Sequence, residues 1–301
     1  MNGLDQIDGS IEAAVDVWVD PRPAAEAAGG AAVRWDGTRP MPVLRDEGEA
    51  CEFIRGIRRE LVALGLGSAR RVGVLDDGLT PRLARTAYLI GLAGWDVVLW
   101  PGGGRAIGGM ATRDQAVRRP QGAGPGPVAA DGQAAARSPI AAGGAVLSER
   151  DAGPPTAAGA RQAEAGADPA ELRPWRREWL LLQAEAEALA RAGRLFDVRS
   201  AEEFDGTAHA PCCSGGGRIP GARHAPLEWF LDPAVFRTPE RLLSRLGLTA
   251  SEGAPVGVYC HSGARSAVAF FVLRALGVPA RNYLGSMHEW LQLNEAAVFV
   301  V

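Results

Sequence analysis

The sequence predicts an α/β protein with two doubly wound parallel-sheet domains joined by a long flexible linker. Short apolar runs alternate with helix-period runs, the landmarks of one half recur in the other, and an Ala/Gly/Pro-rich segment separates the halves. A length of 301 residues also fits two domains at roughly 150 residues each. We place the first copy at 1–104, the linker at 105–173 and the second copy at 174–301.

The first copy opens with an apolar strand that ends in Asp20-Pro21-Arg22. Helical spacing then predicts a helix over Glu47–Leu64 and another over Arg82–Ala93. Between and after them, the apolar runs ending at Leu75 and at Trp100 predict strands. Strands that alternate with helices in this way are typical of βαβ units and a mostly parallel sheet.

The second copy repeats this order. A helix is predicted over Pro174–Arg191, a strand ending in Asp197-Val198-Arg199, a strand over Val256–Tyr259, a helix over Arg265–Leu276 and a strand over Ala280–Leu284. The two Asp-x-Arg aspartates are 177 residues apart, and the residues that follow the two Val-Gly-Val strands, Asp76 and Cys260, are 184 apart. Ordered landmarks at nearly equal offset indicate a tandem duplication.

The segment between the copies contains no Phe, Trp, Tyr or Cys from residue 101 to residue 174. Such a composition cannot bury enough apolar area to offset its ordering entropy, so we expect it to be mostly disordered. Ordinary connections are a few residues long, and a connection of this length therefore separates two folded units.

Bulk composition excludes several classes of partner. A net charge of −3 argues against nucleic acid or an anionic membrane, and no apolar stretch approaches the roughly 20 residues of a membrane span. The first residues lack a basic and then apolar signal, so we expect a cytoplasmic protein. Four cysteines form no disulfide framework, and the absence of Lys leaves no amine nucleophile.

The loop after the strand Val256–Tyr259 carries the chemistry of the sequence. It reads Cys260-His261-Ser262-Gly263-Ala264-Arg265-Ser266 and runs into a helix. Ligands of parallel sheets bind beyond the carboxyl ends of the strands, and a short loop before a helix can turn several N–H groups onto an anion. We therefore expect His261, Ser262, Gly263, Ala264 and Arg265 to form an anion cradle that keeps the Cys260 sulfur ionised.

Four motifs in order carry a family resemblance. They are Phe196-Asp197-Val198-Arg199, Gly217-Arg218-Ile219-Pro220-Gly221-Ala222, the loop from Cys260 to Ser266, and Gly285-Ser286-Met287-His288-Glu289-Trp290. Together they resemble the rhodanese, or sulfurtransferase, family over about residues 176 to 301. The first copy resembles the catalytically silent N-terminal domain of two-domain members, with Asp76 where the second copy has Cys260.

The sequence departs from the family pattern at several points. Arg218 stands where the family usually has His, and Glu203 stands where many two-domain members carry a substrate-binding Arg. In the loop, Ser262-Gly263 resembles mercaptopyruvate-specific members, whereas His261 and Arg265 resemble members that use thiosulfate. The linker is also longer than the family's usual connection.

The polar residues outside the loop receive the following assignments. Arg265, Arg199, Arg218 and Arg223 are candidates for substrate binding, and Asp197 and Ser266 are expected to be structural near the site, Asp197 as the ion-pair partner of Arg199. Cys212 and Cys213 lie near His209 in a Gly-rich loop; because neighbouring cysteines rarely both ligate one zinc, we expect no metal there. A redox role with Cys260 stays open for this pair. Neither a metal nor an organic cofactor is implied.

The resemblance implies a thiosulfate sulfurtransferase. Cys260 would take the outer sulfur of a small anionic donor as a persulfide and pass it to cyanide or a thiol, in two half-reactions. Three alternatives stay open: a 3-mercaptopyruvate sulfurtransferase, a relay that hands the persulfide to a protein acceptor, and a Cys-dependent phosphatase. The last would need five residues between Cys and Arg, and here the four residues from His261 to Ala264 intervene.

Overall fold

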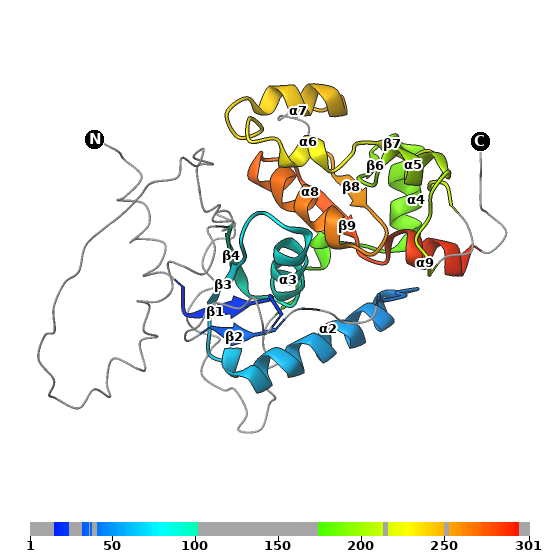
Figure 1. Ribbon diagram of the computed structural model, residues 1–301. Helices are drawn as coiled ribbons and strands as arrows, with labels where there is room; N and C mark the ends of the chain where they lie inside the picture. Colours follow the sequence, from blue (N-terminus) through cyan, green and yellow to red (C-terminus); the bar gives the residue numbers. More distant parts are fainter. Residues whose placement is uncertain are drawn as a thin grey trace, which may run out of the picture.

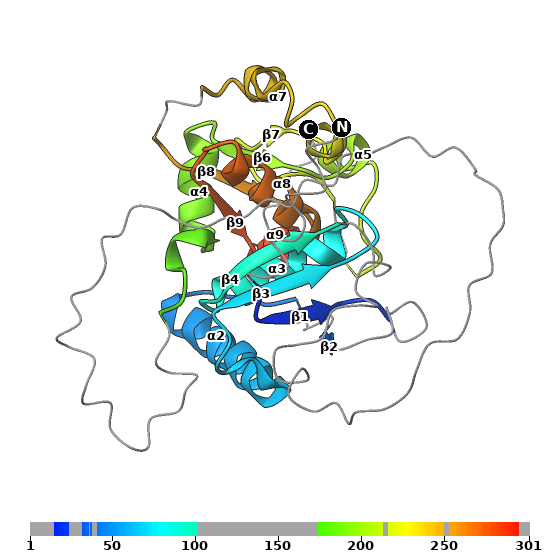
Figure 2. The ribbon, with the colours of Figure 1, turned by 90° about the vertical axis from the view of Figure 1, so that its left-hand side faces the viewer.

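The computed structural model describes residues 15–23, 32–35, 37, 41–101, 174–212, 216–249 and 253–294. The expected linker at 105–173 and the residue Cys213 lie outside these ranges. Two all-parallel sheets form the framework, one in each half of the chain, as Figures 1 and 2 show. The fold class expected from the sequence, α/β with a parallel sheet in each half of the chain, is therefore confirmed.

The first sheet has the strand order β2-β1-β3-β4. Its strands are β1 (Val17–Asp20), β2 (Val33–Arg34), β3 (Arg71–Leu75) and β4 (Asp96–Trp100). Helices α2 (Glu47–Leu61), extended by a turn η1 (Val62–Leu66), and α3 (Pro81–Leu92) contribute their buried residues to the same apolar core as the sheet. The other face of the sheet carries Trp18, Leu75 and Trp100, with the two indole rings 6.1 Å apart.

The second sheet has the order β5-β9-β8-β6-β7. In chain order its elements are η3 (Arg177–Trp179), β5 (Leu180–Leu181), α4 (Gln183–Arg191), β6 (Leu195–Asp197), α5 (Ala201–Asp205), β7 (Arg223–His224), α6 (Glu228–Leu231), α7 (Pro239–Leu246), β8 (Val256–Tyr259), α8 (Ala264–Ala275), β9 (Ala280–Tyr283) and α9 (Ser286–Leu293). Two separate clusters of buried residues cover its two faces, one with α6, α7 and α8 and one with α4 and α9. This is the doubly wound arrangement.

The helix expected over Pro174–Arg191 is wrong in its first half. Leu180 and Leu181 form β5, an edge strand that pairs with Asn282 and Tyr283 of β9, and the helix α4 begins only at Gln183. Trp179 packs instead against the first copy. The apolar run was consistent with either structure, and pairing with a strand about 100 residues away decided between them.

The duplication extends to a shared packing detail in the two central strands. Trp18 lies opposite Gly73 in the first sheet, and Leu195 lies opposite Gly257 at the equivalent register of the second. A Cβ added to Gly73 would lie 2.4 Å from the Trp18 ring, and one added to Gly257 would lie 2.6 Å from the Leu195 side chain. Each Val-Gly-Val strand thus needs glycine because the neighbouring strand folds a large side chain across it.

The two copies pack on each other through α3 and α8, which lie side by side in Figures 1 and 2. Tyr88 of α3 meets Phe270 of α8 edge to face, with ring centroids 5.0 Å apart, and its hydroxyl donates to the Trp179 carbonyl at 3.0 Å. Gly91 of α3 gives room for Trp179, whose ring would lie 2.4 Å from any Cβ there. One continuous apolar core therefore spans both copies.

Among the described helices, none has the length and apolar character that crossing a bilayer would require.

Candidate active site

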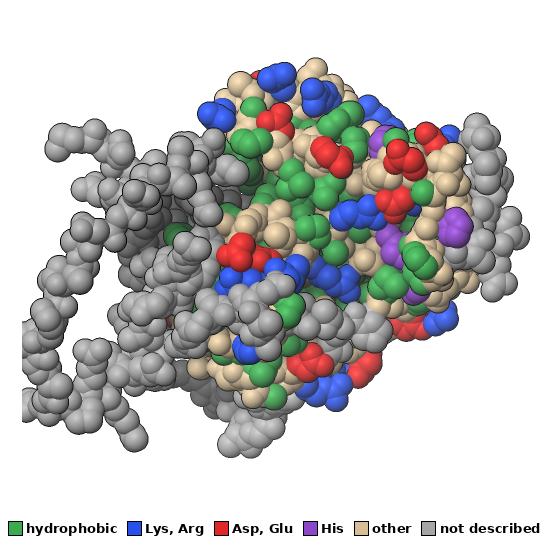
Figure 3. Space-filling model, in the orientation of Figure 1, with side chains coloured by type: hydrophobic (Ala, Val, Ile, Leu, Met, Phe, Trp, Pro, Cys, Tyr) green, Lys and Arg blue, Asp and Glu red, His purple; other side chains and the backbone are tan. Residues whose placement is uncertain are grey.

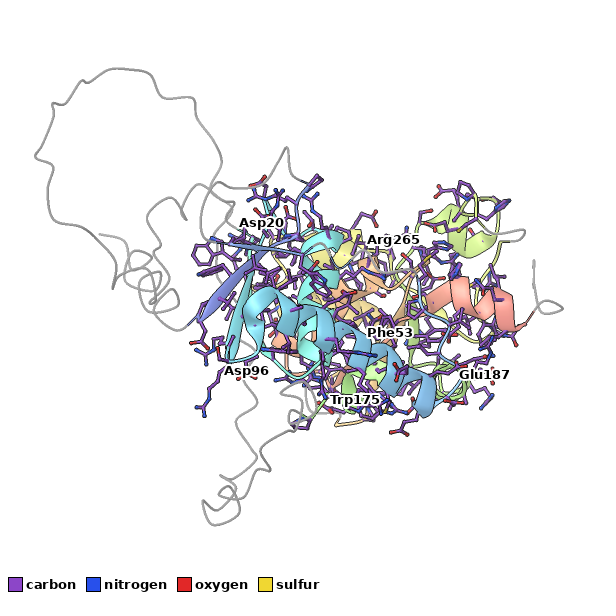
Figure 4. The ribbon with its side chains drawn as sticks, turned by 90° about the horizontal axis from the view of Figure 1, so that it is seen from below. Asp20, Phe53, Asp96, Trp175, Glu187 and Arg265 are labelled. Atoms are coloured by element: carbon purple, nitrogen blue, oxygen red, sulfur yellow. The ribbon has the colours of Figure 1, made fainter. Side chains whose placement is uncertain are left out.

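The Cys260 loop connects the carboxyl end of β8 to the start of α8. Gly263 precedes the helix with φ near +80°, and a Cβ at this position would lie 2.6 Å from the Leu284 carbonyl oxygen. Both the left-handed backbone and the close approach exclude larger residues. In Figure 4, Arg265 at the start of α8 lies on the same side of the molecule as Asp20 at the end of β1, opposite Asp96 and Trp175. Because the loop follows the carboxyl end of β8, it lies where ligands of parallel sheets bind.

The sulfur of Cys260 is buried at the centre of this loop. Its residue is 1% exposed, the Gly263 N–H donates to Sγ at 3.1 Å, and the Ser266 hydroxyl lies 3.5 Å from Sγ. Burial raises the pKa of Cys260, but the Arg265 charge and the hydrogen bonds from Ser266 and the loop backbone outweigh it, so the pKa lies below its usual range. These hydrogen bonds and the Arg265 charge thus favour the thiolate form of Cys260.

Residues at the start of α9 form hydrogen bonds with the backbone of the Cys260 loop. The Ser286 hydroxyl accepts from the Cys260 N–H at 3.2 Å and donates to the Tyr283 carbonyl at 2.7 Å. The N–H groups of Met287 and His288 donate to the carbonyls of Cys260 and His261 at 3.2 and 3.0 Å. The Gly285 to Trp290 motif thus holds the backbone of the Cys260 loop in place. The sequence showed no sign of this role for Ser286 beyond its place in the motif.

The guanidinium of Arg265 is bound by a carboxylate. Its two terminal nitrogens donate to the two oxygens of Glu203 at 2.6 and 2.8 Å. The hydrogen bonds that Arg265 donates to Glu203 raise the pKa of Arg265. Burial raises the pKa of Glu203, but the hydrogen bonds and the charge of Arg265 outweigh burial, so the pKa of Glu203 is lowered. Glu203, which stands where many two-domain members of the resembled family carry a substrate-binding Arg, is therefore the partner of Arg265. The sequence did not reveal this pairing.

The other three arginine candidates also have protein partners. Arg199 is 3% exposed; it forks onto Asp197 at 2.5 to 3.0 Å and donates to the Gly217 carbonyl at 2.6 Å. Arg218 lies over the Phe204 ring at 4.6 Å, and Arg223 donates to the Leu246 carbonyl at 2.8 Å. These contacts agree with the structural role expected for Asp197. Substrate binding by Arg199, Arg218, Arg223 and Arg265 stays a prediction.

Arg85 of the first copy contacts the Cys260 loop, and the sequence did not reveal this contact. It lies on α3, and its guanidinium donates to the Ser262 carbonyl. Burial lowers the pKa of Arg85, and the charge of Cys260 opposes that effect. The first copy therefore adds a cation next to the loop, which only the packing of α3 on α8 could show.

The equivalent loop of the first copy holds a carboxylate where the second holds sulfur. Asp76 is fully buried and accepts hydrogen bonds from the Asp77 N–H, the Thr80 hydroxyl and the Arg82 guanidinium, at 2.5 to 3.1 Å. Burial raises the pKa of Asp76, but these hydrogen bonds outweigh it and hold the pKa below its usual range. These hydrogen-bond donors of the first copy's loop therefore bind the loop's own Asp76 carboxylate.

A thiol and two imidazoles lie together at the Cys260 loop. Cys212 Sγ lies 3.2 Å from His261 Nε2, and the rings of His261 and His288 are 6.1 Å apart. Burial lowers the pKa of both histidines. Figure 3 shows histidine side chains grouped on the right-hand side of the displayed face, next to basic and acidic side chains. His209 is exposed, and Cys213 lies outside the described residues, so the group differs from the one considered in the sequence.

Comparison with known proteins agrees with the motifs. The model of the rhodanese-like domain matches residues 178–293. A human thiosulfate:glutathione sulfurtransferase is 33% identical over 116 residues, which are 36% of this chain and 89% of that protein. A presumed thiosulfate sulfurtransferase of Haloferax volcanii is 36% identical over 115 residues, and the match spans 35% of this chain and 40% of that relative.

One solved structure matches nearly the whole chain. It is the crystal structure of a protein named "Probable Thiosulfate Sulfurtransferase", 42% identical, with a TM-score of 0.62 over 92% of this chain and 95% of that one. The match therefore includes both copies and not the cysteine domain alone. With its ordered motifs, its cysteine loop and these relatives, the chain belongs to the rhodanese family of sulfurtransferases.

Proposed function

We propose that the chain transfers the outer sulfur of thiosulfate to a thiol or cyanide through a persulfide on Cys260. The observation that carries this proposal is the environment of the Cys260 sulfur, which accepts a hydrogen bond from the Gly263 N–H at 3.1 Å. The pKa of Cys260 lies below its usual range in this environment. A thiolate is the nucleophile that sulfur transfer needs, and no general base is required when the loop itself stabilises it.

The first half-reaction forms one sulfur–sulfur bond and breaks another. The Cys260 thiolate attacks the outer sulfur of thiosulfate, and sulfite leaves with the electron pair of the broken bond. The product is a persulfide anion, whose terminal sulfur takes the place of the thiolate in a loop that favours anions. The total charge is the same on both sides, so no proton is needed.

In the second half-reaction an acceptor thiolate or cyanide attacks the terminal sulfur of the persulfide. The new bond joins that sulfur to the acceptor, the bond to Cys260 breaks, and the Cys260 thiolate returns. Because the donor product leaves before the acceptor reacts, ping-pong kinetics follow. The names of the human and Haloferax relatives support thiosulfate as the donor.

We further propose that the second copy, residues 174–301, carries the catalysis and that the first, residues 1–104, is catalytically silent. The Asp76 carboxylate stands in the loop of the first copy at the position where the second copy has the Cys260 sulfur. We also propose a cytoplasmic location, because persulfide chemistry depends on a thiol that a reducing compartment preserves.

The intact mass of the protein after incubation with thiosulfate tests this function. We expect a gain of one sulfur atom that is absent from Cys260→Ser and is removed by cyanide. A folded wild-type protein that gains no mass with thiosulfate would exclude thiosulfate as the donor.

The pairing of Arg265 with Glu203 favours a second candidate donor, 3-mercaptopyruvate. The Glu203 carboxylate neutralises the Arg265 charge that a dianionic donor such as thiosulfate would use. The two side chains are 30% and 17% exposed, so solvent and salt screen this ion pair only in part. A donor with a single carboxylate would lose less from this neutralisation. Parallel assays with both donors decide, since kcat/KM higher for 3-mercaptopyruvate would reverse the assignment.

A further inference from the structure

Cys212, His261 and His288 come together from three separate segments. Cys212 lies on the stretch after α5, His261 follows Cys260 in the catalytic loop, and His288 lies in the first turn of α9. One potential ligand atom from each residue lies within 4.8 Å of the other two. Cys212 is exposed and the histidines are partly buried, so the group is open to solvent on one side.

The spacing of the three groups is close to that of a tetrahedral metal site. Zinc bonds of about 2.3 Å to sulfur and about 2.0 to 2.1 Å to nitrogen place neighbouring ligand atoms roughly 3.4 to 3.6 Å apart. The Cys212 sulfur lies 3.2 Å from His261 Nε2. Small side-chain movements would therefore bring all three atoms onto one ion.

The chemistry of the ligand set also fits this class of ion. One thiolate and two imidazoles suit zinc, whereas the hard cations Mg²⁺ and Ca²⁺ prefer oxygen ligands. The side-chain nitrogen assigned as Nε2 of Gln292 lies 2.7 Å from Nε2 of His288. With the amide oriented so that its oxygen accepts the ring N–H, Gln292 would fix the tautomer of His288 and leave its other ring nitrogen for an ion.

We propose that Cys212, His261 and His288 bind one zinc-class divalent ion, with water as the fourth ligand, and that the bound ion inhibits sulfur transfer. The ion would join the segment after α5, the catalytic loop and α9. Cys260 is 1% exposed, so a donor enters only when its surroundings move. An ion that ties His261 to two other segments resists that movement. The inhibition rests on the proposed function, whereas the binding does not.

Zinc binding to the reduced full-length protein, measured by competition with a chromogenic chelator, tests the site. We expect one ion per chain, with affinity at least about tenfold weaker in Cys212→Ser and His288→Ala. His209→Ala, an exposed histidine close in sequence to Cys212 and outside the group of three, is the matched control and should bind as wild type does. Cys260→Ser should also keep the ion, because the catalytic sulfur is not a ligand. Loss of zinc in Cys260→Ser, or wild-type affinity in Cys212→Ser, would overturn the assignment.

Cobalt in place of zinc reports the ligands without any activity measurement. We expect a thiolate-to-cobalt charge-transfer band and the visible bands of a tetrahedral site in wild type and in Cys260→Ser. Cys212→Ser should lack the charge-transfer band while its circular dichroism stays that of wild type. A charge-transfer band that persists in Cys212→Ser and disappears in Cys260→Ser would place the ion on the catalytic sulfur and refute the site.

The inhibitory part is tested separately by sulfur transfer with and without stoichiometric zinc. Zinc should slow wild type at least about tenfold and leave Cys212→Ser at its metal-free rate, and the metal-free rates of the two proteins should agree. Equal inhibition of both proteins would refute regulation through this site. If wild type transfers no sulfur at all, the proposed function fails, whereas the cobalt spectrum still decides whether the metal site exists.

Discussion

The two loops after the Val-Gly-Val strands start from the same framework and differ in what occupies the anion position. In both copies an Asp-x-Arg pair braces the neighbouring strand: Asp20 with Arg22, and Asp197 with Arg199, each at less than 6% exposure. In the second copy the loop's N–H and hydroxyl donors face the Cys260 sulfur. In the first they face the Asp76 carboxylate, which also takes the guanidinium of Arg82. The fold thus supplies an anion site twice, and this site holds a cysteine sulfur in the second copy and a fixed internal carboxylate in the first.

The first copy nevertheless makes direct contacts with the second copy. Arg85 reaches the Ser262 carbonyl, and the Leu44 N–H donates to the buried Glu289 carboxylate at 2.5 Å. Arg176 donates to the Gly91 and Trp95 carbonyls and to Asp96 at 2.6 to 2.7 Å, so the start of the second copy is bound to the first. The first copy therefore contacts the Cys260 loop and the start of the second copy directly, and it brings the charge of Arg85 to that loop.

The largest effect should come from exchanging the residues at the two anion positions. Cys260→Ser removes the nucleophile and should lower sulfur transfer at least about 100-fold while the protein stays folded. Asp76→Cys should create no second site, because Thr80 and Pro81 give that loop another shape and Pro81 lacks an N–H. Intact mass after thiosulfate treatment measures both variants. A double variant, Asp76→Cys with Cys260→Ser, that gains sulfur would break the comparison.

Stability should depend on Asp76 more than on its exposed neighbour. Asp76→Asn removes the charge that balances Arg82, and breaking a buried pair costs about 3 to 5 kcal/mol. The Arg82 side chain is 36% exposed, so solvent screens the remaining charge and we expect about 2 kcal/mol. Urea unfolding of Asp76→Asn against Asp77→Asn, whose side chain is 68% exposed, measures the difference. Equal losses in the two variants would contradict the assignment of Asp76 as the loop's internal anion.

The same carboxylate predicts an acid dependence. The pKa of Asp76 in the folded protein is lowered from its ordinary value of 3.8, so its stabilisation is fully present above that value. It is lost as the pH falls through the lower, folded pKa. The free energy of unfolding of wild type should therefore fall more steeply with acid than that of Asp76→Asn. Parallel curves for the two proteins below the ordinary pKa would argue against a charged Asp76.

Arg85→Ala should weaken catalysis by about tenfold in kcat/KM, or about 1.4 kcal/mol. The variant removes a cation near the Cys260 thiolate and releases the Ser262 carbonyl. Steady-state kinetics measure it, and Arg55→Ala on the exposed face of α2 is the control. Rates equal to wild type would show that the first copy contributes only packing.

The smallest effect is expected from Glu203→Gln. The variant leaves the Arg265 charge without its counterion, so KM for thiosulfate should fall by about threefold. Glu202→Gln, on the same short helix but exposed, is the control. A rise in KM would indicate that Glu203 positions Arg265 for the donor rather than neutralising it.

The sequence alone determined the features that depend on neighbours in the chain. The two Asp-x-Arg strand ends, the duplication and the cysteine loop before a helix were all legible in it, because cap, turn and strand residues act within a few positions. The boundaries of α3 and α8 agree with the predicted helices to within one residue at each end. Thr80 caps α3, and the left-handed Gly263 begins α8.

Only the tertiary structure decided the contacts between distant residues. Leu180 and Leu181 became a strand because β9 offered an open edge, and Glu203 meets Arg265 across 62 residues of chain. Arg85 reaches Ser262 across 177 residues, and Cys212 reaches His261 across 49. Such contacts follow from how helices pack on sheets, and apolar periodicity specifies which face of a helix is buried without specifying its partner. The cysteine and Arg265 of its loop were therefore visible in the sequence, whereas the charges that distant segments bring to the loop, Glu203 and Arg85, were not.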